Sequence, residues 1–183
     1  YIYNVKKDEV FWAASDVGWV VGHSFIVYGP LINRNATVIF EGKPIKTPDA
    51  STFWRIIAEH KVNAMFTAPT AIRAIKKEDP NGDFIKKYDL SSLKTQFLAG
   101  ERCDIATLEW YSKHISVPAI DHWWQTESGW PMIANMMGIE QLPVKLGSVG
   151  KAVCGYDIKI FDEEGIEVGP NEQGYVVIQL PLP

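Results

Sequence analysis

The residues best suited to chemistry lie in one short segment, residues 121–129, which reads DHWWQTESG. Within nine positions it places two adjacent tryptophans among an Asp, a His, a Gln, a Thr and a Glu. A buried strand rarely contains so many polar groups, and an exposed loop rarely carries two neighbouring tryptophans. Aromatic walls with a few polar groups are typical of a small-molecule pocket. We therefore expect this segment to line a ligand site, with a purely structural aromatic loop as the alternative.

The elements around this segment predict where such a site would lie. Apolar runs of strand type at 36–40, 62–67, 95–99 and 117–120 alternate with helical patterns through the first 146 residues. Alternation of this kind implies parallel crossovers, so the predicted fold class is α/β, a layered and largely parallel sheet with helices on its faces. Segment 121–129 follows the last of these runs, and ligands of such sheets bind at the carboxyl ends of the strands.

Local signals predict where the helices begin and which faces they bury. Residues 19–32 are apolar enough for a buried helix. The triplet Thr47-Pro48-Asp49 is typical of an N-cap followed by proline at the first helical position. The buried face of the helix that follows would carry Phe53, Ile56, Ile57 and His60. Pro69 is expected to open the next helix, and Asp104 to cap one that ends near His114.

The last part of the chain changes character. Residues 156–161 alternate apolar and polar side chains, Glu164-Gly165 is a turn signal, and 175–180 is strand-like. These patterns predict β-hairpins that begin a β-barrel-like subdomain. We expect a division into an α/β portion, 1–146, and a β-rich segment, 147–183. Because a strand ending at the last residues would leave an unpaired edge, we also expect the chain to be part of a larger protein.

Composition excludes several classes of function. The net charge is −4 and the pI is about 5.6, whereas a nucleic-acid surface needs clustered Lys and Arg. No run of 18 apolar residues predicts a membrane span. The two cysteines, Cys103 and Cys154, belong to no Cys/His cluster and suit a reducing compartment, either cytoplasm or mitochondrial matrix. The oligomeric state is not determined by the sequence.

Four segments in the same order resemble the short-chain branch of the adenylate-forming acyl-CoA synthetases. They read DVGWVVGHSFIVYGPL (16–31), TAPTAIRAI (67–75), LAGERCD (98–104) and DHWWQTESG (121–129). EGKPIKTPDA and GSVGKAVCGYDIKIFDEEG extend the resemblance over nearly the whole chain, and it is strongest to propionyl-CoA synthetases. It implies a ligase that joins a carboxylate to the α-phosphorus of ATP and passes the acyl group from AMP to CoA. The implied cofactors and partners are ATP/AMP, Mg²⁺, CoA and a short carboxylic acid, and 1–146 would belong to the AMP-binding domain.

The same resemblance implies roles for individual residues. Thr126 would donate to an α-phosphate oxygen and Glu127 would bind Mg²⁺, while a Thr-Glu pair that caps a helix is the structural alternative. Trp19 and His23 would lie near the adenylate, although a lone His on an apolar helix is more often a core residue. Ala68 would lie near the CoA adenine. The implied nucleotide-binding residues are Gly100, Glu101, Arg102, Asp121, His122, Trp123, Trp124, Gln125 and Thr126.

The implied acyl pocket is formed by Val20, Val21, Ala99 and Trp124. Longer-chain relatives carry glycine where Trp124 stands, so the indole would close the pocket behind a short acid. The acetate-specific pattern has valine where this chain has Ala99, which leaves room for about one more methyl group on the substrate. One methyl group is worth about 1–3 kcal/mol of discrimination. The resemblance therefore favours propionate over acetate, with butyrate a poor substrate.

Some parts of a complete ligase site are not recognisable in the chain. The family's phosphate-binding loop is expected before Tyr1, and its hinge and catalytic lysine after Pro183, so these residues alone are predicted to be inactive. An acetyl-CoA synthetase and a non-catalytic nucleotide- or acyl-binding module remain alternatives. A glycosidase with Asp121 and Glu127 as its carboxylates ranks last, because their spacing suggests no acid/base geometry.

Overall fold

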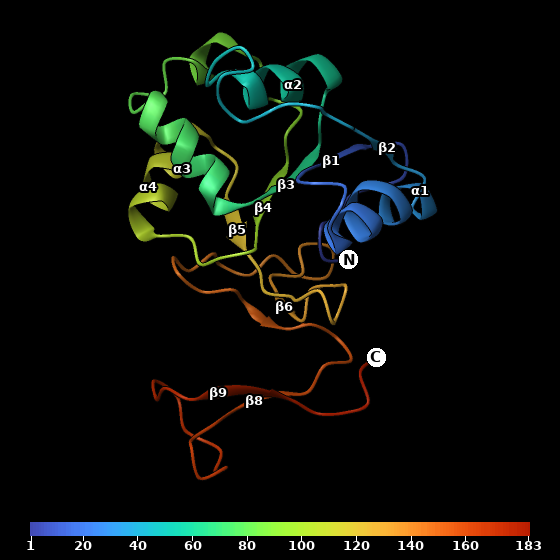
Figure 1. The fold of residues 1–183 in the computed structure, drawn as a ribbon, viewed down its shortest axis with the longest axis vertical. Coiled ribbons are helices and arrows are strands. Elements are labelled where there is room, and N and C mark those ends of the chain that lie inside the picture. Colours follow the sequence, from blue (N-terminus) through green and yellow to red (C-terminus); the bar gives the residue numbers. More distant parts are fainter.

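The computed structural model describes all residues, 1–183, and contains one five-stranded sheet and two small two-stranded sheets (Figure 1). In the large sheet the order is β2-β1-β3-β4-β5, and every pair is parallel. The strands are β1 Val10–Ala14, β2 Ala36–Thr37, β3 Ala64–Thr67, β4 Thr95–Leu98 and β5 Ala119–Asp121. Helices cover the sheet, which confirms the predicted α/β class.

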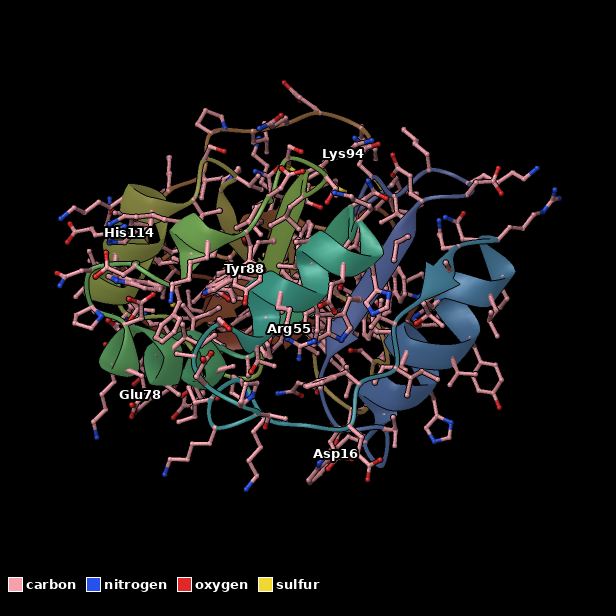
Figure 2. The ribbon with its side chains drawn as sticks, turned by 90° about the horizontal axis from the view of Figure 1, so that it is seen from above. Asp16, Arg55, Glu78, Tyr88, Lys94 and His114 are labelled. Atoms are coloured by element: carbon pink, nitrogen blue, oxygen red, sulfur yellow. The ribbon has the colours of Figure 1, made fainter.

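The sheet separates two hydrophobic cores, because successive side chains of a strand point to opposite faces. On one face Trp12, Met65 and Leu98 belong to a core completed by three helices. These are α2 Thr52–His60, α3 Pro69–Glu78 and α4 Ile105–His114, with the short 3₁₀ turn η2 Ile85–Lys87 beside them. Figure 2, viewed from above, shows α2, marked by Arg55, lying over the strands.

The second core lies on the opposite face of the sheet. Phe66 and Phe97 point into it from β3 and β4, and Tyr3 and Phe25 cover it. Phe25 belongs to the π-helix η1 Gly22–Tyr28, which continues into α1 Gly29–Ile32. This second core extends to the carboxyl edge of the sheet, where the candidate site lies.

The predicted helix at 19–32 is helical but is neither a regular α-helix nor buried. In η1 the amide of Gly29 donates to the carbonyl of Ser24, five residues earlier, and a Cβ at Gly29 would clash with that oxygen. Glycine thus permits the wider π turn. The outer face is open to solvent: Trp19 is 67% exposed and Ile32 is 81% exposed. The prediction of a buried helix is wrong because only the face that carries Phe25 packs on the sheet.

Other boundaries also differ from the sequence prediction. The expected buried strand at 36–40 is only the two-residue edge strand β2, which is not buried. Helix α2 begins at Thr52 rather than at Pro48, because the Asp49 carboxylate accepts from the amide of Ser51 (2.7 Å) and forms a turn before the helix. His60 is exposed at the end of α2, where Lys61 turns the backbone away with φ of 51°.

The predicted strands at 62–67, 95–99 and 117–120 correspond to β3, β4 and β5, within two residues at each end. Two helix signals are confirmed: α3 begins at Pro69, and the Asp104 carboxylate accepts from the amide of Thr107 (2.9 Å) at the start of α4. β1 was not predicted. Its VFWAA run contains two alanines and has no alternating pattern, so it gives a weak strand signal.

The β-rich segment contains the predicted hairpin. Strands β8 Ile158–Phe161 and β9 Tyr175–Ile178 pair antiparallel, and Figure 1 shows them lying apart from the α/β body. A further antiparallel pair, β6 Ile133–Ala134 with β7 Lys151–Ala152, was not foreseen and joins the two sides of the predicted boundary at 146/147. The division into domains stays a prediction. None of the helices is long and apolar enough to span a membrane.

Candidate functional site

The carboxyl ends of β3, β4 and β5 meet at one edge of the sheet, where the candidate site residues follow them. The register pairs Thr67 with Leu98, and Leu98 with Asp121. The ladder continues one step further, because Ala99 donates to the carbonyl of Thr67 (3.3 Å) and His122 donates to that of Leu98 (3.0 Å). The segments that leave β4 and β5 are therefore held side by side.

An open cleft with a volume of about 620 Å³ lies at this edge. Its lining residues are Gly100, Glu101, Arg102, Asp121, His122, Trp123, Trp124, Gln125, Gly147 and Val149. Eight of these ten are among the nine residues predicted to bind the nucleotide; the ninth, Thr126, is exposed in the next turn. The structure thus brings two motifs that are some twenty positions apart into one cleft, and their ligand remains a prediction.

The backbone conformation of Gly100 sets the direction of the loop that follows β4. Its φ of +99° is strained for any L side chain, although an added Cβ would meet nothing within 4 Å. The next residue, Glu101, forms an ion pair with Arg73 of α3 (2.6 Å), and Arg73 also contacts Asp104 (3.3 Å). The hydrogen bond to Glu101 raises the pKa of the Arg73 guanidinium. The ion pair thus holds Glu101, which lines the cleft, against helix α3.

Arg102 is the single cationic side chain of the cleft lining, and it forms no ion pair. Its guanidinium lies over Gly147, where a Cβ would stand 3.1 Å from a guanidinium nitrogen. Gly147 also has φ of +79°, so both conformation and space favour glycine there. Sequence reasoning missed Gly147 and Val149 as lining residues; the glycines of the GSVG run were the available signal.

His122 is a buried residue with both ring nitrogens hydrogen-bonded. Nδ1 lies 2.6 Å from the carbonyl of Leu98, and Nε2 lies 2.7 Å from the hydroxyl of Tyr3. Because a carbonyl can only accept, Nδ1 carries the proton and Nε2 accepts from Tyr3. Burial lowers the pKa of His122 to about 4, so the ring is neutral at pH 7.

Asp121 ends β5 beneath the cleft. It is 6% exposed, and its carboxylate accepts from the backbone amide of Cys103 (3.4 Å). Burial raises its pKa, a change that the hydrogen bond from Cys103 and the charge of Arg102 oppose.

Thr126 and Glu127 lie in an exposed turn rather than at a helix start. The amides of Ser128 and Gly129 both donate to the carbonyl of Gln125 (3.2 and 3.0 Å), and no helix follows. The helix-capping alternative for the Thr-Glu pair is therefore wrong. The Glu127 carboxylate has no ion-pair partner, and no group of three His, Cys, Asp or Glu residues could hold a metal.

Three of the four predicted acyl-pocket residues lie in the second core. Val21 and Ala99 are buried there, and Trp124 is partly buried and packs against this core. The Trp124 ring lies 5.1 Å from that of Phe25, a residue that sequence reasoning missed although it stands four positions after Val21 on the same helix. Val20 is partly exposed and lies outside this cluster.

The remaining predicted residues do not line the cleft. Trp19 and His23 are exposed, and the His23 ring stacks on Tyr28 with centroids 6.0 Å apart. Ala68 follows β3 and is the N-cap residue of α3, where its carbonyl accepts from the amide of Ala71 (3.0 Å). Their proposed contacts with substrate and CoA stay predictions.

A parallel sheet with a cleft at its carboxyl edge defines an α/β protein of the ligand-binding type. Residues 1–182 match the model of a family described as AMP-binding enzyme. The chain belongs to this family.

The relatives that the chain resembles are longer proteins. It is 54% identical over 182 residues to an uncharacterised protein of Pseudomonas aeruginosa, and 52% identical over 184 residues to acyl-CoA synthetase short-chain family member 3, mitochondrial, of Mus musculus. It is 47% identical over 183 residues to propionate–CoA ligase of Escherichia coli K12. Each match covers 100% of this chain but only 29%, 27% and 29% of the relative, respectively.

Proposed function

We propose that the protein containing this chain is an AMP-forming ligase that activates a short-chain carboxylate, with propionate favoured, and transfers the acyl group to CoA. The observation that carries this proposal is the cleft at the carboxyl edge, which gathers eight of the predicted nucleotide-binding residues next to the cluster of Val21, Ala99 and Trp124. The printed names of two relatives, an acyl-CoA synthetase and a propionate–CoA ligase, support the same chemistry.

The first half-reaction joins a carboxylate oxygen to the α-phosphorus of ATP and releases pyrophosphate. Such a step needs charge neutralisation and in-line positioning more than covalent help. The backbone at Gly100 and the face of Trp123 would hold the adenosine, while Arg102 and the Thr126 hydroxyl would stabilise charge on the phosphate. In the second half-reaction the CoA thiol attacks the acyl carbon and AMP leaves.

Glu127 fits the binding of Mg²⁺, because its carboxylate is exposed and free of ion pairs, and hard cations prefer oxygen ligands. Glu127 belongs to no group of three His, Cys, Asp or Glu residues that could hold a metal, so phosphate oxygens and water would supply other ligands. Bound there, the metal would neutralise phosphate charge.

Chain length would be set by Trp124 and Ala99. The indole of Trp124 packs on Phe25 and Phe66, with centroid distances of 5.1 and 6.4 Å, against the same core in which Ala99 is buried. By the family resemblance, the small side chain at 99 would leave room that a valine would fill. This arrangement supports propionate as the favoured acid.

The test is release of pyrophosphate by the whole protein with ATP, Mg²⁺, CoA and acetate, propionate or butyrate. We expect kcat/KM to be highest for propionate, and Trp124→Gly to raise the butyrate-to-propionate ratio by at least about threefold. A higher kcat/KM for acetate would establish the acetyl-CoA synthetase alternative. Binding of AMP without turnover of any acid would establish the non-catalytic module.

The 183 residues alone should not form acyl-AMP, because a phosphate-binding loop and a catalytic lysine are not recognisable among them. Pyrophosphate release by the isolated chain would contradict this. We further propose small-molecule partners only, neither nucleic acid nor membrane, and a location in the cytoplasm or the mitochondrial matrix.

A further inference from the structure

A buried hydrogen-bonded pair connects the beginning of the chain to the cleft. Tyr3 and His122 are separated by 119 positions, and the Tyr3 hydroxyl donates to Nε2 of His122 (2.7 Å). On the other side of the ring, Nδ1 donates to the carbonyl of Leu98 (2.6 Å), the last residue of β4. The imidazole thus links three parts of the chain that are remote in sequence.

The surroundings of this pair are apolar. The Tyr3 ring meets Phe97 edge-on at 4.4 Å, and the His122 ring meets Phe66 and Phe97 edge-on at 5.2 and 5.3 Å. Tyr3 and His122 are 8% and 2% exposed. A buried donor or acceptor that loses its partner cannot turn to water, so each member depends on the other.

His122 also fixes the start of the segment that lines the cleft. The next residue, Trp123, exchanges backbone hydrogen bonds with Ile133 (2.9 and 3.2 Å) and so continues away from β5. Trp124 then packs against Phe25, which itself meets the Tyr3 ring at 5.7 Å. A shift of the imidazole would therefore move the backbone that presents both tryptophans.

We propose that Tyr3 is a positioning residue for the ligand cleft, acting through His122 to hold Trp123 and Trp124 in place. Its effect on catalysis rests on the proposed function, whereas its effect on the two indoles does not. Tyr3 itself does not line the cleft and would touch no substrate.

The experiment compares Tyr3→Phe with Tyr111→Phe in the whole protein. Tyr111 is a matched control, because it is 0% exposed, lies in the core on the other face of the sheet, and has a hydroxyl without a hydrogen-bond partner. Each variant is labelled with ¹⁵N-histidine and ¹⁵N-tryptophan. We expect Tyr3→Phe to shift the imidazole resonances of His122 and the indole resonances of Trp123 and Trp124, and Tyr111→Phe to leave all three unchanged.

Kinetics supply the second readout. Because displaced tryptophans would bind the adenylate less well, Tyr3→Phe should lower kcat/KM for propionate by about tenfold and change the butyrate-to-propionate ratio. In the His122→Asn background, where the amide can still donate to Leu98, Tyr3→Phe should have little further effect.

Indole resonances that do not move in Tyr3→Phe would overturn the proposal, as would an acid selectivity equal to that of Tyr111→Phe in an active protein. If the wild-type protein activates no acid, the proposed function fails, and the resonances alone then decide whether Tyr3 positions the cleft.

Discussion

The neutral, buried His122 predicts a specific loss of stability in mild acid. In the unfolded chain a histidine has a pKa near 6.5, whereas burial lowers the pKa of His122 in the folded protein to about 4. Between these values the unfolded state binds more protons than the folded state, so stability falls as the pH falls. The contribution is fully present above about pH 6.5 and is lost as the pH falls toward 4.

The size of this effect follows from the two pKa values. Between pH 7 and pH 5 the free energy of unfolding should fall by about 2 kcal/mol through this residue, and by about 3 kcal/mol at pH 4. His122→Asn provides the comparison, because asparagine does not titrate. It should be less stable than the wild type at pH 7, and the gap between the two proteins should shrink by about 2 kcal/mol at pH 5.

Urea denaturation followed by tryptophan fluorescence, at several pH values, measures both proteins. Other groups also contribute to the pH dependence: burial raises the pKa of Asp121, and hydrogen bonds from Ser91 lower that of Asp89 to about 2. Such groups are common to both proteins and cancel in the difference. Parallel stability curves from pH 7 to pH 5 would refute the conclusion that His122 is held neutral by burial.

Four further substitutions test the candidate site. Glu127→Gln should lower pyrophosphate release at least about tenfold with little change in propionate affinity, and Thr126→Val should cost about 2–4 kcal/mol in kcat/KM if the hydroxyl acts in the transition state. Unchanged rates in both variants would remove these residues from the site. Ala99→Val should shift the acetate-to-propionate ratio of kcat/KM toward acetate by at least about threefold, and an unmoved ratio would place Ala99 outside the acyl pocket. Gly100→Ala should weaken AMP binding in equilibrium dialysis, since its φ of +99° costs alanine about 1–2 kcal/mol; unaltered affinity would show that this turn does not shape the nucleotide site.

The sequence alone was sufficient to predict the alternation of strands and helices in the α/β portion. The structure confirms the apolar runs at 62–67, 95–99 and 117–120, Pro69 at the first position of α3 and the Asp104 cap. The run at 36–40 forms only the two-residue edge strand β2, and β1 was not predicted. Because parallel strands place their carboxyl ends at one edge, the same order also predicted that the segments after β4 and β5 would meet. The cleft residues from Gly100 to Gln125 follow from this rule and from the motifs.

Only the tertiary structure determined which predicted site residues are exposed and which contacts between separate elements fix their positions. The pattern of residues 19–32 predicts burial, yet only one side of η1 meets the sheet, so Trp19 remains exposed. Likewise no local pattern could pair β7 with β6, or Arg73 with Glu101, since each pair depends on how separate elements pack.

His122 illustrates the division most clearly. Its neighbours in sequence marked it as part of a ligand-binding segment, and the structure does place it at the cleft. Its tautomer, its neutral state and its link to Tyr3 depend on a hydroxyl 119 positions away and on the carbonyl that ends β4. Sequence order determines which side chains follow each strand, whereas hydrogen bonding and burial are determined by contacts that form only when distant segments pack together.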